Sequence, residues 1–167
     1  MGFDLYSTKK HHTEKGGYFR NTVWYWRPLA DYVLEHTGVI DEKDKRLWHS
    51  NDNLHVSKET AQQIANQLKA LIEQGHTKKH IKKIEQIRKS AIEHNTKVAK
   101  LFELLKLKVE KETGKEAPIP REYPKEDHDL WEFICNLQDY RYSYSFDMEN
   151  VKDFIEFCEH SEGFTIC

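Results

Sequence analysis

The densest group of residues that could bind a charged ligand lies in the run GYFRNTVWYWRPL, residues 17–29. Aromatic rings stack on planar groups, arginine forks hold phosphate or carboxylate, and an asparagine amide reads hydrogen-bonding edges. The run therefore predicts a site for a small anionic ligand, with nucleotide-like molecules among the candidates. Its residues are Tyr18, Arg20, Asn21, Trp24, Trp26 and Arg27. The alternative is a core helix whose tryptophans pack and whose arginines extend their charged ends to solvent.

A second polar group follows Trp48, in the sequence His49-Ser50-Asn51-Asp52. A loop of this composition can supply a general base, a metal-binding carboxylate, or turn and capping hydrogen bonds. We add His49, Asn51 and Asp52 to the predicted ligand-binding residues.

Metal and cofactor chemistry have weaker signals. The His11-His12 pair and the His76/His80 pair could ligate a metal, but neither has a carboxylate at a zincin position. The sequence contains no GxxxxGK[ST], GxGxxG, GxSxG or HExxH motif. Cys135, Cys158 and Cys167 form no CxxC pair, so we expect reduced thiols. We therefore expect no cofactor and no metal.

The elements that must position these residues can be read from periodicity. Residues 2–6 and 164–167 are strand-like and have no other evident partner, so they are expected to pair in a small two-stranded sheet. A helix begins near Asn21 and contains Pro28. Further helices are expected around residues 129–140 and after Asp147.

Residues 57–74 and 78–112 are predicted to form an antiparallel helical hairpin. Ser57 caps the first helix, and Gly75 separates the two. Arg88 and Asn95 are polar residues in the mainly apolar seam of the second helix, and they are candidates for setting its register. We interpret 57–113 as a projecting insertion and the proline-rich segment 114–127 as a loop.

The expected fold is one α+β domain, residues 1–167, mostly α-helical. Nineteen of the twenty aromatic residues lie outside the segment between Leu54 and Glu122, which predicts an aromatic core built from the two ends of the chain.

Charge is distributed unevenly. Residues 69–111 hold twelve Lys/Arg and five acidic residues, whereas residues 112–167 hold five Lys/Arg and fourteen acidic residues. The basic helix lacks interleaved aromatics for stacking, so nucleic acid is a poor candidate partner. A host protein or a second copy bound through the 57–112 hairpin are the other candidates. Without an apolar span or a leader pattern, we expect no membrane association and a cytoplasmic location.

Four motifs together resemble an uncharacterised family of small phage, prophage and bacterial proteins: MGFDLY, GYFRNTVWYWRPLADY, WHSND and FDMENVKDFIEFCEHSEGFTIC. The resemblance covers about residues 1–60 and 140–167, and one position departs from the family's GGF pattern, which here is Glu162-Gly163-Phe164. The resemblance brings no established activity. It implies a phage-type protein in the host cytoplasm, and it favours a functional role for the polar members of the aromatic-arginine run.

These observations favour binding of an anionic ligand without catalysis, with sequestration of an immune signal of the host as one biological setting. Two alternatives stay open. One is a hydrolase or transferase in which His49 or Asp52 is the base and Arg20 or Arg27 holds the anion. The other is an interaction module that inhibits a host protein through its basic hairpin.

Overall fold

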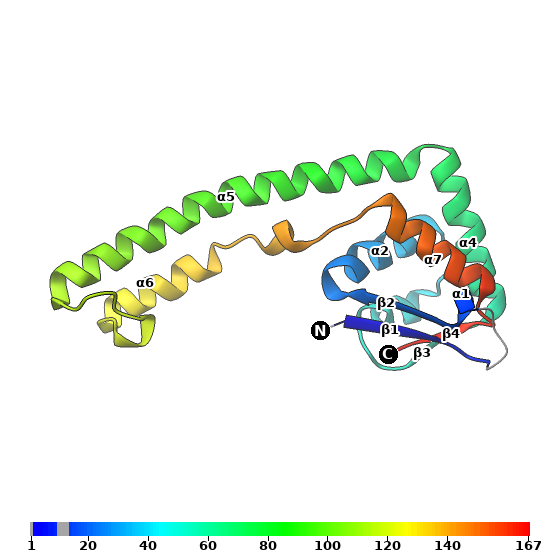
Figure 1. Cartoon of the computed structure of the whole chain (residues 1–167), viewed down its shortest axis with the longest axis horizontal. Helices are drawn as coiled ribbons and strands as arrows, with labels where there is room; N and C mark the ends of the chain where they lie inside the picture. Colours follow the sequence, from blue (N-terminus) through cyan, green and yellow to red (C-terminus); the bar gives the residue numbers. More distant parts are fainter. Residues whose placement is uncertain (1, 10–13) are drawn as a thin grey trace. The chain divides into compact units, whose positions relative to one another are not determined.

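The computed structural model describes residues 2–9 and 14–167, which form two compact units, each with its own apolar core. The first unit consists of Met1–Glu85 and Tyr144–Cys167, and the second of Gln86–Ser143. The long helix α5, His76–Thr113, begins in the first unit and continues into the second (Figure 1). The chain is mostly helical with a small sheet, so the α+β class is confirmed.

The sheet of the first unit is antiparallel, with strand order β2-β1-β4-β3. Its strands are β1 (Gly2–Ser7), β2 (Tyr18–Thr22), β3 (Leu54–Val56) and β4 (Phe164–Ile166). The terminal strands pair as the sequence predicts, with Leu5 opposite Ile166. The sheet has four strands and not the predicted two, because β3 is only three residues long and β2 ends in residue types that also begin helices.

The core of the first unit lies between this sheet and helices α2 (Val23–His36), α4 (Lys58–Glu73) and α7 (Met148–His160). Alternation along the strands turns Phe3, Leu5 and Phe19 inward. Trp26 and Trp48 are fully buried, with their rings stacked at a centroid distance of 5.7 Å. The predicted aromatic core is confirmed. Three short helices complete the unit: α1 (Glu14–Gly17), α3 (Glu42–Lys45) and η1 (Arg46–His49).

Helix α2 continues through Pro28 because another segment replaces the missing hydrogen bond. Proline has no N–H, so the carbonyl of Trp24, four residues earlier, lacks its helical donor. The backbone N–H of Ser145 donates to that carbonyl at 3.0 Å. The helix begins at Val23 with Thr22 as its N-cap, so Asn21, near which the helix was expected to begin, belongs to β2.

Helix α4 belongs to the main core, which corrects the prediction of a projecting hairpin over 57–113. Its apolar stripe lies in the first core and consists of Ala61, Ile64, Ala65 and Leu68. It packs against α7, and Ser57 caps it as predicted. The sequence pattern shows that α4 has one apolar face but not which element covers that face.

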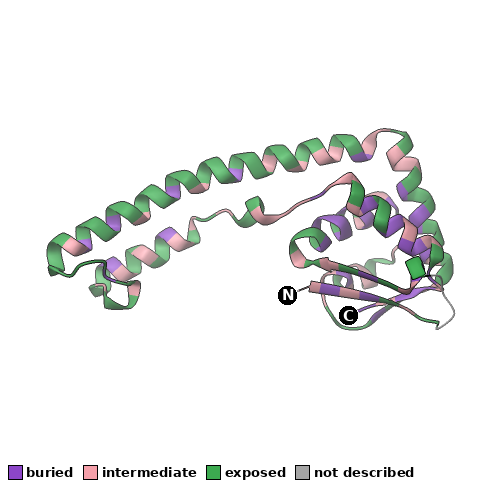
Figure 2. Ribbon diagram, in the orientation of Figure 1, coloured by how far each residue is buried: buried purple, intermediate pink, exposed green. Residues whose placement is uncertain are grey.

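The second unit pairs the rest of α5 with α6 (Lys125–Asn136), and its connections include η2 (Pro120–Glu122) and η3 (Tyr140–Ser143). Its core contains Val98, Leu105, Val109 and Ile134. Figure 2 shows that most of α5 is exposed. The proline-rich segment 114–127, predicted as a loop, contains η2 and the first turn of α6.

Three polar side chains of α5 hold the segment that follows α6. Arg88 Nε donates to the Tyr142 carbonyl at 2.9 Å, and a ring nitrogen of His94 lies 2.7 Å from the Leu137 carbonyl. Asn95 bonds the backbone of Asp139 in both directions. The predicted register residues Arg88 and Asn95 therefore contact this segment of the second unit. None of the described helices has the length and hydropathy of a membrane span.

Candidate functional site

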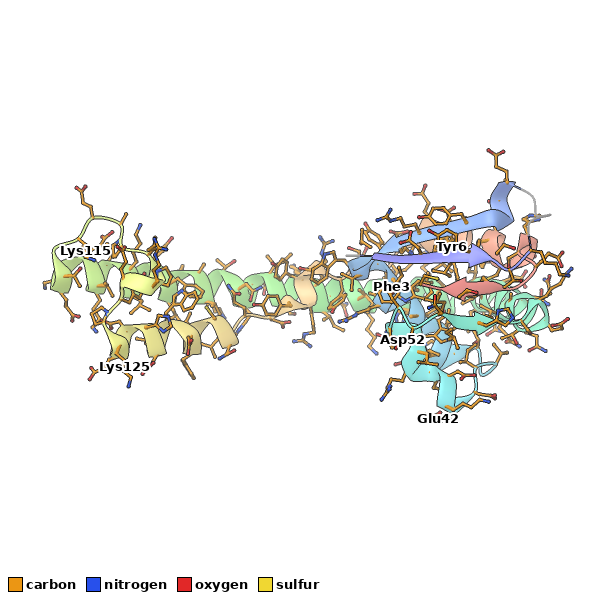
Figure 3. All side chains as sticks on the ribbon, turned by 90° about the horizontal axis from the view of Figure 1, so that it is seen from below. Phe3, Tyr6, Glu42, Asp52, Lys115 and Lys125 are labelled. Atoms are coloured by element: carbon orange, nitrogen blue, oxygen red, sulfur yellow. The ribbon has the colours of Figure 1, made fainter. Side chains whose placement is uncertain are left out.

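The outer face of the sheet presents two of the predicted ligand-binding residues, Tyr18 and Arg20. Because side chains alternate along a strand, Asp4 and Tyr6 of β1 point to the side opposite the core, as Tyr18 and Arg20 of β2 do. The register places Tyr6 opposite Tyr18 and Asp4 opposite Arg20. Figure 3 labels Tyr6 together with the inward residue Phe3 of the same strand.

The strand register aligns further residues with Tyr6 and Tyr18 across the sheet. Tyr6 is also opposite Thr165 of β4, and Thr165 is opposite His55 of β3. One row perpendicular to the strands therefore contains Tyr18, Tyr6, Thr165 and His55. We call this row, together with Asp4 and Arg20, the outer face.

The polar groups of the outer face are held by Asp4. The Tyr18 hydroxyl donates to the Asp4 carboxylate, and this hydrogen bond raises the pKa of Tyr18 above its ordinary value. Arg20 Nε lies 3.6 Å from the same carboxylate. The rings of Tyr6 and Tyr18 have centroids 5.1 Å apart and stay 49% and 46% exposed. The face thus combines a paired aromatic surface with a guanidinium group.

Trp26 and Asn21 do not belong to the outer face, because their side chains make contacts elsewhere in the fold. Trp26 is fully buried, and its indole N–H donates to the Trp48 carbonyl at 2.7 Å, so it is a core residue. The Asn21 amide donates to the Asn150 side chain at 2.9 Å. Asn21 also lines a surface pocket of about 220 Å³ that contains Asp147, Glu149 and Asp153. Three carboxylates make that pocket unfavourable for an anion.

Trp24 and Arg27 share a different neighbour, Tyr144. The rings of Trp24 and Tyr144 meet edge to face at 5.4 Å, and Arg27 donates to the Tyr144 hydroxyl at 3.3 Å. These contacts anchor the segment after η3 to the outer side of α2.

The His49–Asp52 loop makes separate contacts. His49 Nε2 lies 3.1 Å from the Asp31 carboxylate of α2. The Asn51 amide donates to the Gly2 carbonyl at 3.4 Å, at the end of β1, and Asp52 is exposed. The predicted residues thus have contacts in several places and are not assembled around one pocket.

A cluster of three histidines around Tyr32 was not predicted. His36 of α2 contacts His76 and His80 of α5, with ring centroids 4.5 and 5.8 Å away. The Tyr32 hydroxyl lies 3.0 Å from both His76 Nδ1 and the Thr77 hydroxyl. Burial lowers the pKa of His80 to about 4 and also lowers that of His36. His36 and His80 are therefore neutral at pH 7, and the three rings pack against Tyr32 and one another.

One group of possible metal ligands occurs in the described parts of the chain. His128, Asp129 and Glu132 of α6 place one ligand atom each within 4.8 Å of the others, and none of the three is buried. The predicted His76/His80 pair belongs instead to the cluster around Tyr32, and His11 and His12 lie outside the described residues. All three cysteines are free, as expected.

The outer face contains residues that the sequence interpretation left out. Tyr6 alternates with Phe3 and Leu5, so its outward direction was available from the pattern. His55 lies on the outer face because β3 pairs with β4, and the sequence pattern did not predict β3. Comparisons with protein-family models, curated proteins and solved structures find no match to this chain.

Proposed function

We propose that the outer face of the sheet binds a small, planar, negatively charged molecule of the nucleotide class and releases it unchanged. The observation that carries this proposal is the exposed pair of rings, Tyr6 and Tyr18, on adjacent strands with centroids 5.1 Å apart. Large aromatic side chains exposed together on a folded surface are typical of contact sites. Planar heterocycles gain about 1–3 kcal/mol per base by stacking on such rings.

Arg20 supplies the charge that an anionic group needs. It follows Tyr18 by two residues on the same strand, so both side chains lie on the same face. The Arg20 side chain is 66% exposed, and its contact with Asp4 is through Nε. A ring stacked on the tyrosines would place its phosphate or carboxylate toward the exposed part of this guanidinium.

Asp4 makes the face ordered before any ligand arrives. Its carboxylate accepts from Tyr18 and lies beside Arg20, so two of the binding side chains already have a defined position. Order that is already present lowers the entropy lost on binding. Four-stranded sheets with aromatic residues on neighbouring strands are a recurrent platform for stacked bases.

The resemblance to phage proteins supports a biological setting for this proposal. A phage-encoded protein that binds a nucleotide without consuming it would sequester a signal of the host's immune response. Such a role needs a stable binding face and no chemical step, which agrees with the composition of the outer face.

The test is isothermal titration with AMP, UMP and inorganic phosphate. Tyr18→Ala should weaken nucleotide binding by about 1–3 kcal/mol, and Arg20→Ala by about 1.5–3 kcal/mol. Tyr140→Ala is the matched control, because Tyr140 is 56% exposed and belongs to the second unit. The proposal is wrong if no nucleotide binds, or if Tyr140→Ala weakens binding as much as Tyr18→Ala does.

The alternative function, a hydrolase or transferase, is favoured by one specific observation. His49 Nε2 lies 3.1 Å from Asp31, and a carboxylate beside an imidazole orients the ring and stabilises its protonated form. If His49 is a general base, His49→Ala should reduce turnover of a nucleotide by about 10²–10⁴ with binding retained. Chromatography of the ligand after incubation separates the two functions, because the binding protein returns it intact.

A further inference from the structure

The second unit has one apolar side that its own core does not cover. The seam between α5 and α6 includes Val98, Phe102, Leu105 and Val109 on α5 and Ile134 on α6. A stripe along α5 consists of Lys97, Leu101, Leu104 and Lys108. Each of these residues comes one position before a residue of the seam. Their spacing of four, three and four residues keeps them on one side of the helix.

Helix α6 carries a matching stripe. Glu126, Leu130 and Phe133 each precede, by one position, a residue that faces the seam: Asp127, Trp131 and Ile134. The two helices run antiparallel, as the contacts Lys108–Asp127 and His94–Leu137 show. In an antiparallel pair of helices, the residues that come one position before the seam residues lie on the same side of the pair in both helices. Both stripes therefore belong to one face, which we call the stripe face.

The stripe face is apolar at its centre. Leu104 and Phe133 are 63% and 60% exposed, and Leu101 and Leu130 are exposed as well. The Lys108–Asp127 ion pair fixes the register, which brings Leu101 level with Phe133 and Leu104 level with Leu130. The opposite side, one position after the seam, is mainly polar and includes Glu103, Lys106, Glu110, His128 and Glu132.

Charge on the stripe face is divided between the helices. The stripe of α5 has lysines at both ends, Lys97 and Lys108, whereas α6 contributes Glu126 and the neighbouring Asp129. A partner that complements this face must be acidic opposite α5, basic opposite α6 and apolar between them. A second copy of the same face, turned about a two-fold axis parallel to the helices, meets all three requirements.

We propose that the second unit binds a second copy of this chain through the stripe face, forming a four-helix bundle. In this arrangement α5 of each copy lies antiparallel to α6 of the other. Leu104 then packs at the level of Leu130 of the other copy, and Lys108 lies near Glu126 of the other copy. This inference concerns the second unit alone and does not depend on the proposed ligand at the outer face.

The test is the mass of the full chain in solution, measured by sedimentation equilibrium. One chain has a mass of 19.9 kDa, and the unsubstituted protein should sediment with twice that mass at micromolar concentration. The double variant Leu104→Glu/Phe133→Glu should dissociate at least tenfold more readily. Leu107→Glu is the matched control, because Leu107 is 60% exposed on the same helix but outside the stripe, and it should leave the dimer unchanged.

A cysteine experiment tests the orientation. Chains carrying Leu104→Cys mixed with chains carrying Leu130→Cys should form a disulfide between chains under mild oxidation, above the background of the unsubstituted protein. Leu104→Cys alone should not, because the two copies of position 104 lie diagonally across the bundle. A monomeric unsubstituted protein, or equal dissociation by the Leu107→Glu control, would overturn the proposal. Cross-linking of Leu104→Cys to itself would overturn the arrangement.

Discussion

Asn95 and Asp139 are joined by a pair of hydrogen bonds that closes the second unit. The Asn95 amide donates to the Asp139 carbonyl at 3.0 Å, and its oxygen accepts from the Asp139 N–H at 2.9 Å. One side chain thus satisfies both backbone groups of a residue in the segment after α6. The pattern of apolar positions along α5 treats Asn95 as an exception, and this contact gives the physical reason for it.

Asn95→Ala should destabilise the second unit by about 1–3 kcal/mol, because both backbone groups of Asp139 lose their protein partner. Hydrogen exchange at the Asp139 amide measures this effect directly. Thr96→Ala is the control, since the Thr96 hydroxyl bonds only the Ile92 carbonyl of its own helix. Unchanged protection of the Asp139 amide in Asn95→Ala would contradict the assignment.

Leu68→Ala should lower the free energy of unfolding of the first unit by about 2–5 kcal/mol, the usual cost of a cavity in a packed core. Leu68 is fully buried in the first core, whereas a leucine on a separable hairpin would cost less. Leu107→Ala, at an exposed position, should change stability by less than about 0.5 kcal/mol. Chemical denaturation followed by tryptophan fluorescence reports mainly on this unit, which contains Trp24, Trp26 and Trp48, and equal small effects would show that α4 lies outside the core.

Gly163→Ala should destabilise the sheet more than Gly38→Ala does. Both glycines have a positive φ, +83° and +66°, which costs an alanine about 1–2 kcal/mol. At Gly163 an added Cβ would also lie 2.7 Å from the Val56 carbonyl oxygen, whereas at Gly38 nothing lies within 4 Å. Thermal denaturation should therefore rank the two variants in that order, and a reversed order would contradict the close approach of β3 to Gly163.

The histidine cluster predicts a loss of stability in acid. Burial, the neighbouring histidines and Lys83 lower the pKa of His80 to about 4, whereas Asp31 acts in the opposite direction. The unfolded chain takes up a proton near the ordinary pKa of 6.5, so the stability that the neutral ring contributes is present above that pH and falls between about pH 6.5 and 4.

This loss should be on the order of 1–2 kcal/mol, once solvent screening of a half-buried ring is allowed for. Urea denaturation at pH 7, 6 and 5 measures it. His80→Gln should flatten the pH dependence, whereas His94→Gln, which affects the second unit, should leave the dependence of the first unit unchanged. An equally steep decline in His80→Gln would show that other groups cause it.

The sequence predicted the parts of the fold that local periodicity determines. The two terminal strands had no other partner, Ser57 and Asp147 are capping types at the starts of apolar stripes, and both residues cap helices. It did not predict β2, because the residues before α2 suit either a strand end or a helix cap. The neighbour that covers α4 is set by tertiary packing, which no local pattern encodes.

The same contrast between local sequence pattern and tertiary packing applies to the candidate site. Alternation along β1 indicates that Tyr6 faces outward, and residue types point to Tyr18 and Arg20. Trp26 belongs to the same dense run but is buried, because the turn of α2 carries it to the core side. Residue types alone do not distinguish it from Trp24, which is partly exposed two positions earlier.

The most direct test of the binding face is a nitrogen-15 NMR titration of the full chain with UMP. We expect chemical shift changes concentrated at Tyr6, Tyr18, Arg20, Thr165 and His55, the residues that the strand register brings to the outer face. Inorganic phosphate alone should shift Arg20 most and the tyrosines little. Changes centred on Trp24 and Tyr144, or on His49 and Asp31, with the outer face unaffected would show that the ligand does not bind the outer face.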